Sequence, residues 1–158
     1  MKYVIPIIVI MLTLPLSASE EDIAWPAYGS APGGGHYSKA TQITPANVSN
    51  LEVAWQHRSG DFRLGPIQGV EGFSGDAMPA SAFIGTPIVA NDTLYYCTPY
   101  NRIFALDPQT GEERWAFDPG VAHELEHLTN CRAVSSWTDP DLPSEALCKH
   151  RIIAPTLD

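Results

Sequence analysis

Two histidines, His123 and His127, have the spacing in this chain that most directly suggests metal chemistry. They lie four positions apart with Glu124 and Glu126 between them, and on a helix that spacing places two side chains on one face. Imidazole nitrogens and carboxylate oxygens are both ligands of divalent metals. A solvated short helix or loop explains the same residues equally well, and no Cys-x-x-Cys pair supports a zinc site.

The first 19 residues have the features of a secretory signal peptide. Lys2 supplies a short basic region, residues 3–16 are almost wholly apolar, and small residues follow up to Ser19. This order is typical of a cleavable export signal, and the apolar run is shorter than the roughly 20 residues that a membrane-spanning helix needs. We therefore predict an exported, periplasmic protein in which residues 1–19 are removed and residues 20–158 fold. An uncleaved membrane anchor is the alternative.

The charge of the chain argues against one class of partner. Its formal net charge is −9. An acidic chain repels the phosphate backbone of DNA and RNA. We therefore expect no nucleic-acid partner and attribute the acidity to solubility.

Export permits disulfides, and the chain has three cysteines. Cys97 stands at the end of an apolar run that begins at Leu94, which is typical of a buried strand. Cys131 and Cys148 lie in a stretch rich in loop-forming residues. Because an odd number leaves one cysteine over, we predict a Cys131–Cys148 disulfide and a free Cys97.

The segment 105–115 has the turn chemistry of a hairpin in a repeat protein. Asp107 can bond its own backbone, the proline that follows fixes φ, and Gly111 supplies a position with positive φ. Trp115 then enters the return strand with a large flat surface suited to burial between two sheets. The positions that define this motif are Ala105, Asp107, Thr110, Gly111 and Trp115.

Short β-rich runs separated by Gly, Pro, Asn and Asp dominate the mature chain and predict an all-β fold. The expected strands are 52–57, 86–90, 93–98, 102–106, 113–117 and 151–155. The four runs between Thr86 and Phe117 follow one another through short turns, which is typical of one blade of a β-propeller. A weaker echo of the repeat ends at Trp55, and the segments 58–82 and 118–149 are expected to be long loops on one rim.

One blade cannot bury its own faces, and propellers have about 4–8 blades. The chain holds one full blade with parts of two others, and it stops at Asp158 where a further repeat would begin. We therefore expect a truncated sequence, in which residues 20–158 are the N-terminal portion of a larger propeller.

Beyond the repeat at 105–115, three stretches resemble the dehydrogenases of alcohols, glucose and quinate that depend on pyrroloquinoline quinone (PQQ). The repeat itself is similar to the tryptophan-docking repeat of these quinoproteins. The stretches are 25–55 with its WPAYG start, 85–95 with its GTPIV start, and 130–153 with its NCRAVS start. The last is closest to the membrane glucose and quinate branch. The resemblance implies a partial β-propeller made of the first blade and parts of the adjacent blades.

The resemblance also implies a reaction, in which a hydride passes from a sugar, polyol or alcohol hydroxyl to the quinone. It implies calcium or a similar divalent metal, an Asp as base, and a respiratory quinone or cytochrome as electron acceptor. Arg132 matches the arginine with which the family contacts the quinone, and a planar guanidinium that is always charged suits developing negative charge. No residue of this chain matches the family's catalytic Asp or metal ligands.

Three positions depart from the family pattern. Ile84 stands where the family has a glutamate that contacts PQQ, and Ala133 stands where a glycine commonly follows the arginine. Trp137 lies where the glucose branch has a histidine. Losing a carboxylate and an imidazole from one pocket puts cofactor binding or the usual substrate in question, and we expect the chain alone to be inactive.

Two other interpretations stay open. The first is a non-enzymatic propeller scaffold, such as the outer-membrane assembly lipoproteins that share the repeat. A lipoprotein needs a cysteine at its cleavage site, whereas the first cysteine here is Cys97. The second is the product of a decayed gene, which Ile84 and the abrupt end at Asp158 favour.

Overall fold

The structure is a computed structural model that describes residues 24–31, 33–61, 83–121 and 130–156. The expected signal peptide and the His123–His127 pair lie outside these residues. Within them, strands dominate and the helical element is a three-residue 3-10 turn, η1 (Val48–Asn50), so the all-β prediction is confirmed. No helix in these ranges is long and apolar enough to cross a membrane.

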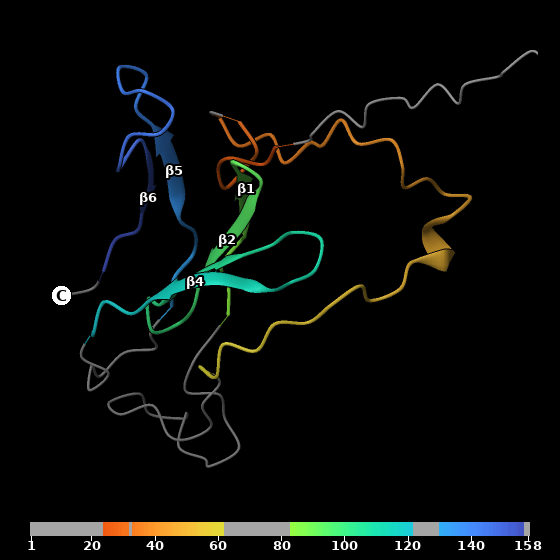
Figure 1. The fold of residues 1–158 in the computed structure, drawn as a ribbon. Helices are drawn as coiled ribbons and strands as arrows, with labels where there is room; N and C mark the ends of the chain where they lie inside the picture. The colour runs from red at the N-terminus through yellow and green to blue at the C-terminus, as the bar shows by residue number, and fades with distance from the viewer. Residues whose placement is uncertain (1–23, 32, 62–82, 122–129, 157–158) are drawn as a thin grey trace, which may run out of the picture.

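A four-stranded antiparallel sheet forms the centre of the described chain (Figure 1). Its strands pair in the order in which they occur in the sequence. They are β1 (Ile88–Ala90), β2 (Thr93–Cys97), β3 (Ile103–Leu106) and β4 (Glu113–Phe117). This meander is the blade that the sequence predicted, with strand ends that differ by one or two residues.

Residues that tolerate positive φ make the first two turns of the blade. Asn91 and Asp92 have φ of 48° and 55°, and two consecutive left-handed residues are the requirement of a tight hairpin turn that matches the twist of its strands. Asn101, with φ of 61°, makes the turn between β2 and β3. Short amide and carboxylate side chains tolerate this conformation better than most, so the turn chemistry read from the sequence is confirmed.

The third turn is built around Asp107. Its side chain accepts hydrogen bonds from the backbone N–H of Gln109 and of Thr110, both at 2.9 Å, and the Arg114 guanidinium donates to it at 2.8 Å. The hydrogen bond from Arg114, followed by those from the two amides, lowers the pKa of Asp107 to about 2. The carboxylate is therefore charged at neutral pH and closes the turn from the inside.

Trp55 packs on this turn from a segment more than fifty residues earlier in the chain. Its indole N–H donates to the Pro108 carbonyl at 3.2 Å. A Cβ added at Gly111, where φ is 74°, would lie 2.5 Å from ring carbons of Trp55. Gly111 is therefore needed twice, for its backbone conformation and for the close approach of the ring. The weaker match to the repeat, which ends at Trp55, thus contacts the full repeat directly.

We expect Gly111→Ala to lower the free energy of unfolding by more than about 1 kcal/mol, because alanine is disfavoured at positive φ and its Cβ would clash with Trp55. Gly120→Ala is the matched control, since Gly120 has φ of 69° but no atom within 4 Å of an added Cβ. Urea unfolding of the two variants measures the difference. Equal losses would show that the Trp55 contact contributes nothing.

The hydrophobic core lies on one face of the sheet. Alternate residues of the blade point into it, and the loop before β5 covers them. The buried members are Ile88, Ala90, Tyr95, Cys97, Ile103, Ala105, Cys131 and Val134, with Ile152 and Ala154 packed against them. The core therefore joins the blade to residues 130–156.

A second, two-stranded antiparallel sheet consists of β5 (Ser135–Thr138) and β6 (His150–Ile153). β6 was predicted near this position, but β5 was not, because its polar residues lie inside a stretch expected to be a loop. The Arg151 guanidinium on β6 stacks over the Trp137 ring on β5 at 4.6 Å. The aromatic side chain at position 137 is thus held by a neighbouring cation.

Two expectations about strands and packing are wrong. The predicted strand 52–57 is not a strand, and it pairs with no strand in the described ranges. Trp115 is not buried between two sheets: it remains 41% exposed and contacts the Tyr95 ring of its own sheet, with centroids 5.8 Å apart. Both errors come from assuming neighbouring repeats that the described residues do not supply.

Candidate functional site

Arg132 has an exposed side chain on a backbone that lies close to buried residues. Its predecessor Cys131 and the nearby Val134 are both buried in the core. The Arg132 side chain is exposed and makes no hydrogen bond or ion pair with any residue that the structure describes. The guanidinium is therefore presented to solvent from a fixed point of the fold.

The disulfide next to Arg132 corrects the predicted pairing. Cys131 is bonded to Cys97, with their Cα atoms 5.8 Å apart, and Cys148 is a free, exposed cysteine. Cys97 is the last residue of β2 and faces the core, where the loop containing Cys131 also enters. Cys148 was the wrong choice because closeness in sequence and loop context say nothing about which side chains enter the core.

Gly85 fits against both partners of this disulfide. A Cβ added there would lie 3.0 Å from the Cys131 carbonyl oxygen and 3.3 Å from that of Cys97. The next residue, Thr86, donates its backbone N–H to the Arg132 carbonyl at 2.8 Å. The segment 84–86 therefore lies beside 131–132, and we call Ile84, Gly85, Cys131 and Arg132 the Arg132 rim.

The rim brings together Ile84 and Arg132, two positions at which the family resemblance implies a contact with the cofactor. Ile84 is exposed and stands on the segment that borders Arg132. An isoleucine offers no carboxylate for a ligand, so the polar contact available at this rim is the guanidinium. Ala133 follows on the same loop, whereas Trp137 lies further on, in β5.

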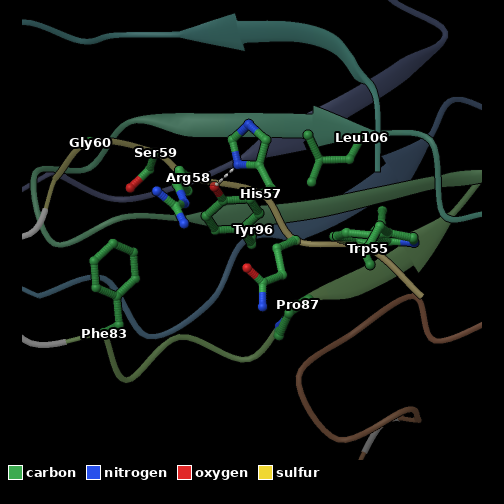
Figure 2. A pocket seen from close by; sticks show the side chains of 11 residues that line it. Trp55, His57, Arg58, Ser59, Gly60, Phe83, Pro87, Tyr96 and Leu106 are labelled. Carbon is green, nitrogen blue, oxygen red and sulfur yellow. Dashed lines mark hydrogen bonds between the residues drawn. The ribbon is translucent and has the colours of Figure 1, made fainter. Parts of the chain in front are cut away.

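An apolar pocket of about 800 Å³ lies over the opposite face of the blade (Figure 2). The segment 55–60 passes over Tyr96 of β2 and Leu106 of β3. Phe83 and Pro87 line the side of the pocket that lies away from His57 (Figure 2). Its lining residues are Trp55, Gln56, His57, Arg58, Ser59, Gly60, Phe83, Pro87, Leu94, Tyr96 and Leu106. The segment 83–87 thus contributes both to this pocket and to the Arg132 rim.

His57 lies on segment 55–60, which we call the crossing segment, and links it to the blade through two polar contacts. Its Nδ1 lies 2.6 Å from the Tyr96 hydroxyl, and its Nε2 lies 3.5 Å from a carboxylate oxygen of Glu113. Burial, together with the nearby carboxylates of Asp61 and Glu113, raises the pKa of Tyr96 to about 12. The tyrosine therefore keeps its proton at neutral pH and holds the segment rather than acting as a base.

Arg102 makes the second link between this segment and the blade. It donates to the Asp61 carboxylate at 2.7 Å and to the Ser59 carbonyl at 2.9 Å, and it also lies over the Phe104 ring at 4.8 Å. The roles of Arg102 and His57 could not be predicted from local patterns, because their partners lie about forty positions away. The alternation of Trp55 and His57 along the expected strand 52–57 was a local signal.

The rim fits one part of the cofactor that the resemblance implies, and the described residues do not fit its metal. A guanidinium without a carboxylate partner suits a carboxylate or quinone oxygen, to which it can donate two hydrogen bonds. No three His, Cys, Asp or Glu gather to hold a metal ion anywhere in the ranges with a described structure. Arg132 is therefore a candidate contact for PQQ, and calcium has no assigned ligand.

The four-stranded antiparallel meander is the repeating unit of a β-propeller, which is the class of protein that the fold indicates. Residues 25–158 match the family model described as the PQQ "Glucose/ethanol/alcohol dehydrogenase, beta-propeller domain". The match covers most of the chain, so this chain belongs to the PQQ-dependent dehydrogenase family.

Curated relatives support the same assignment. The chain is 36% identical over 145 residues to a quinoprotein glucose dehydrogenase of Escherichia coli, covering 87% of this chain and 17% of that one. It is 32% identical over 122 residues to a quinate/shikimate dehydrogenase (quinone) of Acinetobacter baylyi, covering 77% and 14%. It is 30% identical over 111 residues to a 1-butanol dehydrogenase (cytochrome c) of Thauera butanivorans, covering 70% and 12%. The chain thus spans less than one fifth of the length of these relatives.

Proposed function

We propose that this chain is the N-terminal portion of a periplasmic PQQ-dependent dehydrogenase that oxidises a hydroxyl group of a sugar, polyol or alcohol. The observation that carries the proposal is Arg132, an exposed guanidinium that has no hydrogen-bond or ion-pair partner among the described residues. By resemblance, Arg132 corresponds to the arginine with which the family contacts its quinone. The family match over residues 25–158 and the glucose, quinate and butanol dehydrogenases among the relatives support the reaction class.

PQQ, when bound, accepts the hydride that leaves the substrate carbon. Arg132 would hold the cofactor by charge-assisted hydrogen bonds and stabilise the negative charge that develops on its oxygens. The disulfide and Gly85 would keep the Arg132 backbone in place, and Ile84 would add an apolar contact at the position where the resemblance implies a glutamate. Within the ranges that the structure describes, no residues are assigned to the base or to a calcium ion.

The partners and location follow from the same proposal. One relative carries "quinone" in its name and another carries "cytochrome c", and these names support a respiratory quinone or a cytochrome as electron acceptor. Residues 1–19 would direct the chain to the periplasm, either as a cleaved signal or as a membrane anchor. A small-molecule hydroxyl compound is the substrate class.

Equilibrium dialysis of PQQ against the purified chain tests this function. We expect saturable binding that Arg132→Ala weakens about tenfold, because one charge-assisted hydrogen bond contributes about 1.5 kcal/mol or more. Arg151→Ala is the matched control, since it removes the same charge from a guanidinium that stacks on Trp137. Absence of saturable binding, or equal loss in both variants, would instead favour a non-enzymatic propeller scaffold.

A further inference from the structure

We propose that the Cys97–Cys131 disulfide and Gly85 act as positioning residues for Arg132. They fix the backbone from which the guanidinium reaches an anionic or quinone oxygen of the cofactor. The inference rests on the proposed function, in which Arg132 contacts PQQ, and it assigns the rim a task that the predicted Cys131–Cys148 pairing would not have supplied.

Three separate contacts immobilise the backbone around Arg132. The disulfide joins its neighbour Cys131 to the end of β2. Gly85 brings segment 84–86 against the carbonyl oxygens of Cys131 and Cys97, and the Thr86 N–H donates to the Arg132 carbonyl at 2.8 Å. These contacts come from the segment before β1 and from the end of β2, so two parts of the blade hold the backbone at Cys131 and Arg132.

The side chain itself has no comparable support. Arg132 is exposed, and no residue in the described ranges binds its guanidinium. A long side chain without a partner keeps its rotamer freedom, and ordering it on a ligand costs free energy. The cost is lowest when the backbone is already fixed in place, because only the side chain then has to be ordered. The affinity that Arg132 provides should therefore depend on the disulfide, although the disulfide does not touch the guanidinium.

Limited digestion with trypsin tests the structural half of this inference, because trypsin cleaves after Arg132. We expect cleavage there to be at least about tenfold faster in Cys97→Ala/Cys131→Ala than in the unaltered chain, with cleavage after Arg114 and Lys149 changed less than twofold. Cys148→Ala is the control and should leave all three rates unchanged. An unchanged rate at Arg132 overturns the inference.

A double-mutant cycle on PQQ binding tests the functional half. Arg132→Ala should weaken binding about tenfold with the disulfide present, but less than twofold in the Cys97→Ala/Cys131→Ala background. A tenfold loss in both backgrounds overturns the positioning role while leaving the proposed function intact. No saturable binding by the unaltered chain overturns the proposed function itself, and the positioning role with it.

Gly85→Ala provides a second route if the double cysteine variant unfolds, which faster cleavage at every trypsin site would reveal. The added Cβ presses on the Cys131 and Cys97 carbonyls while the disulfide stays in place. We expect faster cleavage after Arg132 and weaker PQQ binding in this variant. Neither effect would appear if the backbone at Arg132 had no part in cofactor binding, and the inference would then be wrong.

Discussion

The isolated chain is expected to show no substrate-dependent dye reduction with PQQ, calcium and a panel of sugars and alcohols. The resemblance implies that hydride transfer needs a base and a metal beside the quinone, and among the described residues we assign only Arg132 to the cofactor site. The loss of even one preorganised donor can lower a rate by about 10²–10³. Losing several should leave no measurable turnover.

The exposure of Arg132 to water is a second reason to expect no turnover. Arg132 is exposed in the described structure, and the attraction between charges weakens several-fold in water and is screened further by salt. The measurement is a dye-linked assay of the purified chain, with Arg132→Ala as the comparison. Turnover that requires substrate and disappears in Arg132→Ala would show that more of the catalytic machinery is present than we assign.

Replacement of Ile88 by alanine is expected to lower the free energy of unfolding by about 2–5 kcal/mol. Ile88 is fully buried, at 0% exposure, on the first strand of the blade, within the cluster that includes Cys97 and Val134. Truncation there removes apolar contacts and leaves a cavity lined by the blade and the loop before β5. Small domains have a total stability of only about 5–15 kcal/mol, so the variant should lose a large share of it.

Ile43→Ala is the matched control for Ile88→Ala, because Ile43 is 60% exposed and its truncation should change the stability by less than about 0.5 kcal/mol. Urea unfolding monitored by circular dichroism measures both variants. If the two midpoints shift equally, the blade is not packed in solution as the structure shows.

The blade could be predicted from the sequence because its determinants are local. Asn91-Asp92 and Asn101 favour left-handed turn conformations whatever surrounds them. The Asp107 side chain closes its turn with amides two and three residues away. Alternating apolar runs between such turns pair with their nearest neighbours in sequence, and that is a four-stranded meander. Arg132 could likewise be singled out from the sequence, because it lies in the NCRAVS stretch that resembles the family.

The disulfide, the packing of the crossing segment and the exposure of Trp115 depended on tertiary structure. Cys97 pairs with Cys131 because the core face of β2 meets the loop before β5, a coincidence of two segments 34 residues apart. His57 likewise binds Tyr96 of β2, and Arg102 binds Asp61, through contacts between the blade and a segment about forty residues earlier. Residue types and spacing determine which local backbone conformations are low in free energy. Contacts between distant segments depend instead on how the faces of those segments pack against each other. For that reason the sequence determined the blade and the family, and the fold decided what holds Arg132 in place.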